Sequence, residues 1–206
     1  MSVRCLPAGP NALLVELEDQ EAALALAAEI ERHRTADWLG RVRDVVPGAR
    51  TVLLDGIEDP AAVAAELTGW TVAPLPPAPA GEAVEIRCRY DGPDLETVAA
   101  CWGVDPDQVP EVHTSLAHRV AFCGFVPGFA YISGLGARRA VPRLEVPRPS
   151  VDAGSVAVAG PYTGIYPRAT PGGWRILGHT DAVLWDPERP RPALLAPGTP
   201  VRFTVA

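Results

Sequence analysis

The stretch from Phe122 to Gly178 decides the fold of the second half of this chain, and it reads FCGFVPGFAYISGLGARRAVPRLEVPRPSVDAGSVAVAGPYTGIYPRATPGGWRILG. Glycine, proline and aromatic residues are interleaved in it more densely than an ordinary core requires. Glycine lets the backbone adopt positive φ or approach a ligand closely, and proline stiffens loops. Two interpretations are open: rigid, aromatic-lined loops that form a small-molecule pocket, or a β-barrel whose many tight turns need Gly and Pro.

Composition sets limits on the partners of the protein. The 206 residues suit one or two domains, and 48% of them are hydrophobic, which is enough for a real core. A net charge of −7 argues against nucleic acid and against an anionic membrane surface as partners. Every basic residue is Arg, so a P-loop lysine and a Schiff-base lysine are both excluded.

The cysteine pattern and the N-terminus suggest a cytoplasmic protein. The cysteines are scattered, without a CxxC pair or a Cys/His cluster, which is typical of reduced thiols and predicts no metal site. The start of the chain, MSVRCLPAG, lacks the apolar region of a signal peptide, and no stretch has the length of a transmembrane helix. The four cysteines are Cys5, Cys88, Cys101 and Cys123.

Residues 1–73 predict a small α/β sandwich domain. Asp19 and Asp59 are suitable N-caps for two helices, and Pro60 suits the first helical position. The order of elements is ββαββα, and two helices covering one face of an antiparallel sheet predict a ferredoxin-like arrangement. The expected strands are 3–6, 12–17, 42–46 and 51–54, and the expected helices are 20–33 and 60–69.

Residues 74–82 contain four prolines and predict a semi-rigid linker, followed by a β-rich domain over residues 83–206. This domain begins with an alternating strand at 84–90 and two short helices, the second of which Pro110 is expected to limit. Short strands punctuated by Gly and Pro then predict a barrel or sandwich. The expected strands are 118–122, 155–159, 164–166, 174–177, 182–185 and 201–205.

Two turns are candidates for binding. The loop from Phe125 to Tyr131 flanks a rigid Pro127-Gly128 turn with aromatic rings, and it either lines a pocket or closes a barrel end. The pair Gly172-Gly173 can present backbone N–H groups to an anion or a carbonyl oxygen, or it forms a plain hairpin turn.

The polar candidates are also open to two interpretations. His113 and His179 can act as general acids or bases near neutral pH, or serve as hydrogen-bonded structural residues. Arginines between positions 138 and 148, notably Arg143 and Arg148, can clamp a phosphate or carboxylate, or form a solvated loop or subunit contact. The G-x-S-x-G spacing of a nucleophilic serine is missing, so covalent catalysis has no candidate.

The motifs GFVPGFAYISGL, AGSVAVAG, TGIYP and PGGW, in order between His113 and Phe203, resemble the KipI/PxpB family. This family is also known as allophanate hydrolase subunit 1, or as carboxyltransferase-domain proteins. The resemblance implies an α+β protein: an α/β N-terminal domain followed by a cyclophilin-like β-barrel.

The resemblance also implies an activity shared with partners. With a KipA/PxpC-like cyclophilin-fold subunit and a PxpA-like subunit, such a chain would form an ATP-dependent 5-oxoprolinase, which opens 5-oxo-L-proline to L-glutamate. ATP would be bound by the assembled complex, and the substrate is a small amide. The alternatives are a component of an allophanate or urea amidolyase, and a KipI-like inhibitor of a histidine kinase.

Matching the motifs to this sequence implies a site with His113 and His179 as catalytic residues. His179 stands where the family commonly has Arg; an Arg is a permanent cation, whereas His is charged only near or below its pKa. Apart from the motifs, Arg143 and Arg148 remain the candidate clamp for phosphate or carboxylate, and no metal is expected. The substrate-binding residues would be Phe125, Pro127, Gly128, Tyr131, Thr163, Gly164, Tyr166, Gly172, Gly173 and Trp174.

Overall fold

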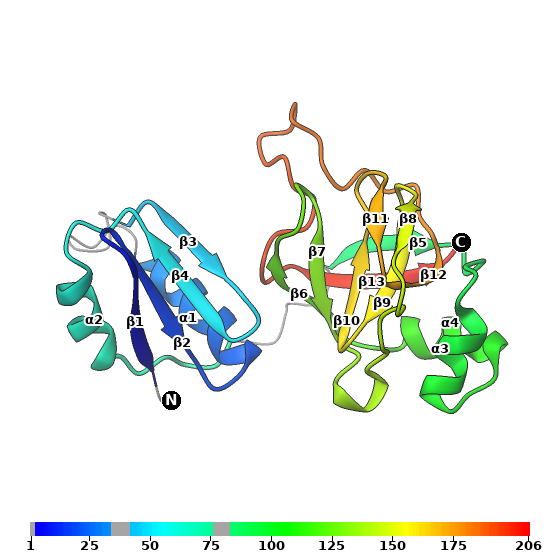
Figure 1. The fold of residues 1–206 in the computed structure, drawn as a ribbon, viewed down its shortest axis with the longest axis horizontal. Coiled ribbons are helices and arrows are strands. Elements are labelled where there is room, and N and C mark those ends of the chain that lie inside the picture. The colour runs from blue at the N-terminus through cyan, green and yellow to red at the C-terminus, as the bar shows by residue number, and fades with distance from the viewer. Residues whose placement is uncertain (1–2, 34–41, 76–82) are drawn as a thin grey trace. The chain divides into compact units, whose positions relative to one another are not determined.

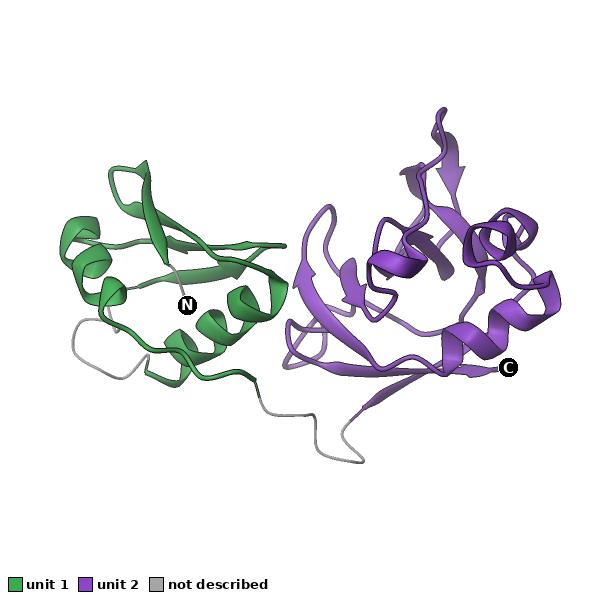
Figure 2. Ribbon diagram, turned by 90° about the horizontal axis from the view of Figure 1, so that it is seen from below, with its two compact units in different colours: residues 1–77 green, residues 78–206 purple. Residues whose placement is uncertain are grey.

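A computed structural model of the chain describes residues 3–33, 42–75 and 83–206 (Figure 1). The chain divides into two compact units, Met1–Pro77 and Ala78–Ala206, each with its own hydrophobic core (Figure 2). Most of the predicted linker, residues 76–82, lies outside the described residues.

The N-terminal unit follows the predicted order of strands and helices. The carboxylate of Asp19 accepts a hydrogen bond from the Ala22 N–H at 2.8 Å, and Asp59 accepts from the first turn of the next helix, so both predicted N-caps are confirmed. The strands form an antiparallel sheet in the order β1-β2-β4-β3. The elements are β1 (Arg4–Gly9), β2 (Ala12–Glu16), α1 (Gln20–Arg32), β3 (Asp44–Pro47), β4 (Thr51–Asp55) and α2 (Pro60–Thr68).

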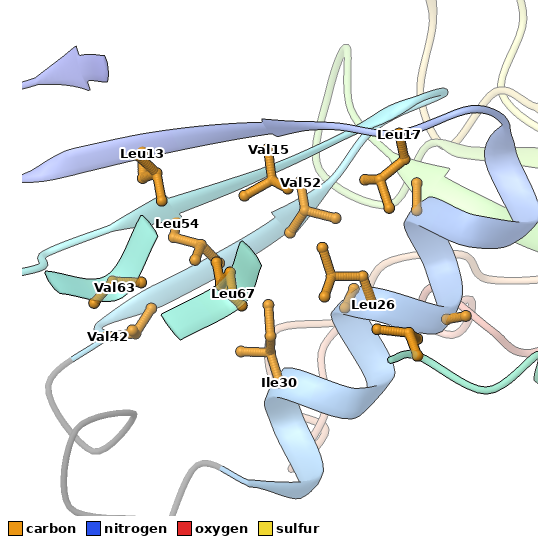
Figure 3. Packing of buried hydrophobic residues seen from close by; sticks show 14 of the residues in the cluster. Leu13, Val15, Leu17, Leu26, Ile30, Val42, Val52, Leu54, Val63 and Leu67 are labelled. Carbon is orange, nitrogen blue, oxygen red and sulfur yellow. The ribbon is translucent and has the colours of Figure 1, made fainter. Parts of the chain in front are cut away.

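One face of this sheet carries the core. Successive side chains of a strand point to opposite faces, so Leu13 and Val15 of β2 lie on the same side as Leu54 of β4. These side chains meet Leu26 and Ile30 of α1 (Figure 3). Burial of this face is what holds the two helices against the sheet.

The ferredoxin-like prediction for this unit is not confirmed. That arrangement has the order βαββαβ, whereas the unit begins with the hairpin β1-β2 and ends on α2. Moving the last strand of βαββαβ to the front of the chain produces the observed order ββαββα. The sequence therefore predicted the order of the elements correctly, and only the ferredoxin-like arrangement inferred from it is not confirmed.

The C-terminal unit is built on a nearly closed β-barrel. Among the described residues, seven strands form one sheet in the order β12-β9-β10-β7-β6-β13-β5, with β13 and β5 parallel. A short pair, β8 and β11, lies beside it, and α3 and α4 pack against β12 and β13. The elements are β5 (Val84–Cys88), α3 (Leu95–Trp102), α4 (Val109–Thr114), β6 (His118–Cys123), β7 (Ala130–Ser133), β8 (Arg148–Val151), β9 (Ser155–Ala159), β10 (Tyr162–Ile165), β11 (Thr170–Gly172), β12 (Arg175–His179) and β13 (Pro200–Val205).

The edges of the sheet, β5 and β12, meet just beyond the end of β5. Arg89 and His179 exchange two backbone hydrogen bonds of 2.9 Å, which brings the first and last strands of the sheet together. Gly178 makes this approach possible, because a Cβ there would overlap the carbonyl oxygen of Arg89.

Two local predictions for this unit are wrong. Pro110 does not end a helix; it lies in the first turn of α4, where its missing N–H is not needed, and the helix continues through His113. Residues 182–185 do not form a strand, since only Trp185 makes an isolated bridge, with Ala193. The sequence reasoning also missed β7, β8 and β11, which are only three or four residues long.

The wall of the barrel separates two groups of side chains. Val156, Val158 and Ile165 point to the interior, and so does Thr163, which pairs with Val158 across β9 and β10. The alternate residues of β9, Ala157 and Ala159, belong to an aromatic cluster on the opposite face. This two-residue period decides which of the candidate residues can share a site.

Candidate functional site

A pocket of about 280 Å³ lies over the outer face of the barrel wall. It collects residues from the 125–131 loop, from the segment between Arg143 and Pro147, and from the turn that leads into β12. The lining residues are Phe125, Phe129, Tyr131, Arg143, Pro147, Tyr166, Pro171, Gly172, Gly173 and Trp174.

The aromatic lining is organised around Phe129, which is buried. Its ring packs edge-to-face against Tyr131, Tyr166 and Trp174, with centroids 5.2 to 5.4 Å apart. Such contacts place the positive edge of one ring on the negative face of another, and each adds roughly 0.5–1.5 kcal/mol beyond area burial. Gly164 lies beneath this cluster: a Cβ there would stand 2.7 Å from Phe129 and 2.9 Å from Trp174.

The turn before β7 places Phe125 at the pocket. Val126-Pro127-Gly128-Phe129 has the geometry of a type II turn, because the Phe129 N–H donates to the Val126 carbonyl at 3.0 Å and Gly128 has φ +85°. The Val126 N–H also donates to the Gly124 carbonyl at 2.9 Å, which forms a three-residue γ-turn centred on Phe125.

Phe125 is the strained residue of the site. Its φ is +68°, and it is the only non-glycine residue with positive φ in the part of the chain that the structure describes. Its side chain is 60% exposed, although its ring packs edge-to-face on Phe129. A conformation of this kind costs on the order of 1–3 kcal/mol and is concentrated at functional positions of proteins.

The opposite wall of the pocket is the Gly172-Gly173-Trp174 turn. The Gly173 carbonyl accepts a 2.7 Å hydrogen bond from the Leu144 N–H, which ties this turn to the neighbouring loop. Gly172 packs directly on Tyr166, because a Cβ at this position would overlap the Tyr166 hydroxyl. The wall is therefore close-packed at Gly172, which explains why a glycine stands at that position.

Arg143 brings a positive charge to the pocket. Its guanidinium carbon lies 5.9 Å from the centre of the Trp174 ring, a cation–π distance. Burial raises the pKa of the Tyr166 hydroxyl, and the charge of Arg143 acts in the opposite direction. Within residues 3–33, 42–75 and 83–206, Arg143 makes no ion pair with a carboxylate.

Arg148, the other predicted clamp residue, is paired with a buried carboxylate. Its Nη2 donates to both carboxylate oxygens of the buried Asp94 at 3.0 and 2.9 Å, and its Nη1 donates to the Trp174 carbonyl at 3.2 Å. Asp94 also accepts from the Ile176 N–H at 2.7 Å and lies 3.6 Å from Arg175. Arg148 therefore supports the Trp174 backbone and does not line the pocket.

His113 lies on the other side of the barrel wall. The imidazole is fully buried, with Nδ1 2.7 Å from the Tyr90 hydroxyl and Nε2 2.9 Å from the Thr163 hydroxyl. Burial lowers its pKa well below the usual value, and the nearby His118 adds to that shift. The structure does not bring His113 together with Gly172-Gly173, because Thr163 faces the interior while the adjacent Gly164 faces the pocket. We therefore interpret His113 as a structural residue.

His179 lies at the seam of the barrel and also does not line the pocket. Its Nδ1 is 3.0 Å from an Asp91 carboxylate oxygen, and this hydrogen bond is the main reason that the pKa of Asp91 is lowered. Its backbone pairs with Arg89, as described above. Its position is therefore explained by barrel closure.

The structure gathers seven of the predicted residues at one pocket, while His113, His179 and Thr163 lie elsewhere in the C-terminal unit. Pro127 and Gly128 form the turn that presents Phe125, and Gly164 supports the aromatic floor. Phe129, Pro147 and Pro171 line the pocket but were missing from the predicted site. Phe129 could have been found by strand periodicity, since it stands two positions before Tyr131. The seven residues are Phe125, Tyr131, Arg143, Tyr166, Gly172, Gly173 and Trp174.

Metal ligands and membrane-spanning helices are the remaining features that could indicate a function. The described residues include no group of three or more His, Cys, Asp or Glu side chains that could hold a metal ion. They also include no helix that is both long and apolar enough to cross a membrane.

The chain matches a known class of domain. Residues 3–195 match the family model of the carboxyltransferase domain, subdomain C and D, and the chain therefore belongs to this family. A relative in Escherichia coli O157:H7, the B subunit of 5-oxoprolinase, is 41% identical over 209 aligned residues, which cover 97% of this chain and 94% of the relative.

Solved structures support the same fold. The crystal structure of TTHA0988 matches with a TM-score of 0.77 and 33% identity, covering 95% of this chain and 40% of that one. The urea amidolyase of K. lactis matches with a TM-score of 0.67 over 99% of this chain and 15% of that one. At 19% identity, this second match supports the fold alone.

Proposed function

We propose that this chain is the PxpB-type component of a 5-oxoprolinase, which opens the cyclic amide 5-oxo-L-proline to L-glutamate. The observation that carries the proposal is the alignment to the corresponding 5-oxoprolinase component of E. coli, because it extends over nearly the whole of both chains. A match of this extent includes both units of this chain, not one of them alone.

The chemistry fits a site that is completed by other subunits. A lactam is stable at neutral pH, and coupling its hydrolysis to ATP is reasonable if phosphorylation of the amide oxygen activates the carbonyl. This chain has no P-loop lysine, and its pocket of about 280 Å³ has a single Arg in its lining. Ordinary ligand pockets span about 300–1,000 Å³, so the pocket suits a small molecule better than a nucleoside triphosphate.

The partners follow from a site that other subunits complete. We propose that ATP is bound by the assembled complex, together with a KipA/PxpC-like subunit and a PxpA-like subunit, in the cytoplasm. The C-terminal barrel would be cyclophilin-like, with domain limits of 1–73 and 83–206 around the linker 74–82. The pocket between Phe125 and Trp174 would then be the part of the amide-substrate site that this chain contributes.

The test is reconstitution with the partner subunits. The chain is co-expressed with its genomic-neighbour subunits, and ATP hydrolysis and glutamate release are measured with and without 5-oxo-L-proline. We expect ATP hydrolysis that depends on 5-oxo-L-proline, with release of glutamate. A stable complex that hydrolyses no ATP and releases no glutamate contradicts the proposal.

An allophanate or urea amidolyase role is less well supported. Its structural match to urea amidolyase has 19% identity and concerns the fold alone. In the same reconstitution assay, turnover of allophanate in place of 5-oxo-L-proline would favour that role.

A further inference from the structure

We propose that Arg143 binds the carboxylate of a small, flat ring compound that lies against the aromatic walls of the pocket. The identity of that ring, a five-membered lactam, rests on the proposed function. The charge and the shape of the ligand follow from the pocket itself.

The positive charge among the lining residues favours an anionic ligand. Arg143 is the one ionisable side chain of fixed charge among the ten lining residues, and none of the ten is acidic. The remaining lining side chains are aromatic rings, prolines and glycines, which leave the guanidinium without a counter-charge inside the pocket. Arg143 is an exposed residue, and its planar guanidinium can match a carboxylate with two parallel hydrogen bonds.

The walls of the pocket favour a flat ring over a flexible chain. Phe129, Tyr131 and Trp174 meet edge-to-face, so their ring planes stand at steep angles to one another. Phe129 and Trp174 are buried. The ring surface open to a ligand therefore comes from the half-buried Tyr131 and the exposed Phe125. Arg143 lies over the Trp174 ring at 5.9 Å, which places the charge beside an aromatic face. A ring that packs on these surfaces can therefore direct a carboxylate substituent toward Arg143.

The surroundings hold this charge arrangement in place. Arg148, five residues further along, is bound to Asp94 through two hydrogen bonds and supports the Trp174 carbonyl. Asp94 thus satisfies Arg148 outside the pocket and leaves Arg143 as the cation inside it. Two arginines that look equivalent in the sequence have different roles: Arg143 contacts the ligand, and Arg148 positions the wall.

The experiment compares two ring compounds on the full-length chain. Isothermal titration calorimetry measures binding of 5-oxo-L-proline and of pyrrolidin-2-one, which has the same lactam ring without the carboxylate. For Arg143→Gln we expect about 10- to 100-fold weaker binding of 5-oxo-L-proline, as for the loss of a charge-assisted hydrogen bond, and unchanged binding of pyrrolidin-2-one. Arg143→Lys should fall between the two, because it keeps the charge but not the planar fork.

The control is Arg138→Gln, which removes the same charge from an exposed position that does not line the pocket. It should bind both compounds as the unmodified chain does. Equal affinity of the unmodified chain and Arg143→Gln for 5-oxo-L-proline overturns the proposal, and so does equal affinity of the unmodified chain for the two compounds.

Failure of the proposed function has a different signature. If the reconstituted complex does not open 5-oxo-L-proline, the same titrations are made with pyrrole-2-carboxylate and with pyrrole. A preference for the carboxylate that disappears in Arg143→Gln would support the pocket assignment even then. Absence of binding of every ring carboxylate to the unmodified chain overturns it.

Discussion

Replacing Gly172 by Ala tests whether the pocket wall is as closely packed as the structure indicates. The backbone of Gly172 has no positive φ, so Ala is compatible with its conformation. The added Cβ would overlap the Tyr166 hydroxyl and would stand 2.9 and 3.0 Å from two ring carbons of Tyr166. The effect is therefore purely steric.

The expected loss of stability depends on how closely Tyr166 is packed. Its side chain is 1% exposed, and its ring packs edge-to-face on Phe129 with centroids 5.4 Å apart. Inserting a methyl group into a close-packed region costs about 1–3 kcal/mol of the free energy of unfolding. We expect Gly172→Ala to lose about 2 kcal/mol, near the middle of that range.

Gly173 supplies a matched control in the next position. A Cβ there would have its nearest atoms at 3.7 to 3.8 Å, which is ordinary van der Waals contact. Gly173→Ala should therefore change the free energy of unfolding by less than about 0.5 kcal/mol. Urea denaturation of the full chain, followed by tryptophan fluorescence, compares the two variants.

A double-mutant cycle identifies the clash. Tyr166→Phe removes the atom that the new Cβ overlaps, so Gly172→Ala should cost less in that background, by about 1 kcal/mol. Equal effects of Gly172→Ala with and without the Tyr166 hydroxyl would refute the reasoning. Equal costs of the Gly172 and Gly173 substitutions would refute it as well.

Three further predictions concern the surroundings of the pocket. The buried His113 and His118 have lowered pKa values, so the unfolded chain binds more protons than the folded chain in acid. As the pH is lowered beneath about 6.5, the free energy of unfolding should therefore decrease, by up to about 1.4 kcal/mol per pH unit for each histidine. A flat urea-denaturation profile between pH 6 and 5 would contradict this. Asp94→Asn leaves Arg148 without its carboxylate, so the free energy of unfolding, measured by urea denaturation, should decrease by about 3 kcal/mol. Binding of 5-oxo-L-proline should also weaken. Unchanged binding would mean that Trp174 does not need the support of Arg148. Phe125→Gly relieves the strain of positive φ, whereas Phe125→Ala does not. Thermal unfolding should therefore show the Gly variant to be more stable than the Ala variant by about 1 kcal/mol. Equal stability of the two variants would mean that the turn stores no strain.

Much of the fold could be predicted because it follows from local chemistry. The N-caps Asp19 and Asp59 and the alternation of β5 depend on residues close together in the chain, and each was found at its predicted place. The ferredoxin-like arrangement of the N-terminal unit is not confirmed, and the prediction that Pro110 ends a helix is wrong. A proline is compatible both with the end of a helix and with its first turn, and only the following residues decide between them.

The candidate site could be predicted in its aromatic and glycine residues and in Arg143, but not in its histidines or in Arg148. Phe125, Tyr131 and Trp174 stand in motifs dense in Gly and Pro, and such a composition is informative by itself. His113 was predicted to share their site, but it does not line the pocket. Its hydrogen-bond partner Thr163 points to the opposite side of the barrel wall, and that orientation depends on the register of β9, β10 and β7.

The sequence by itself determined which segments form helices, strands and tight turns, because these depend on caps, on side-chain alternation and on the φ preferences of Gly and Pro. Only the tertiary structure decided how the charged residues divide. Arg143 and Arg148 are chemically identical and five positions apart, yet Asp94, more than 50 residues away in the chain, holds one of them and leaves the other at the pocket. Pairing over such a separation depends on how the barrel closes, which no local pattern encodes.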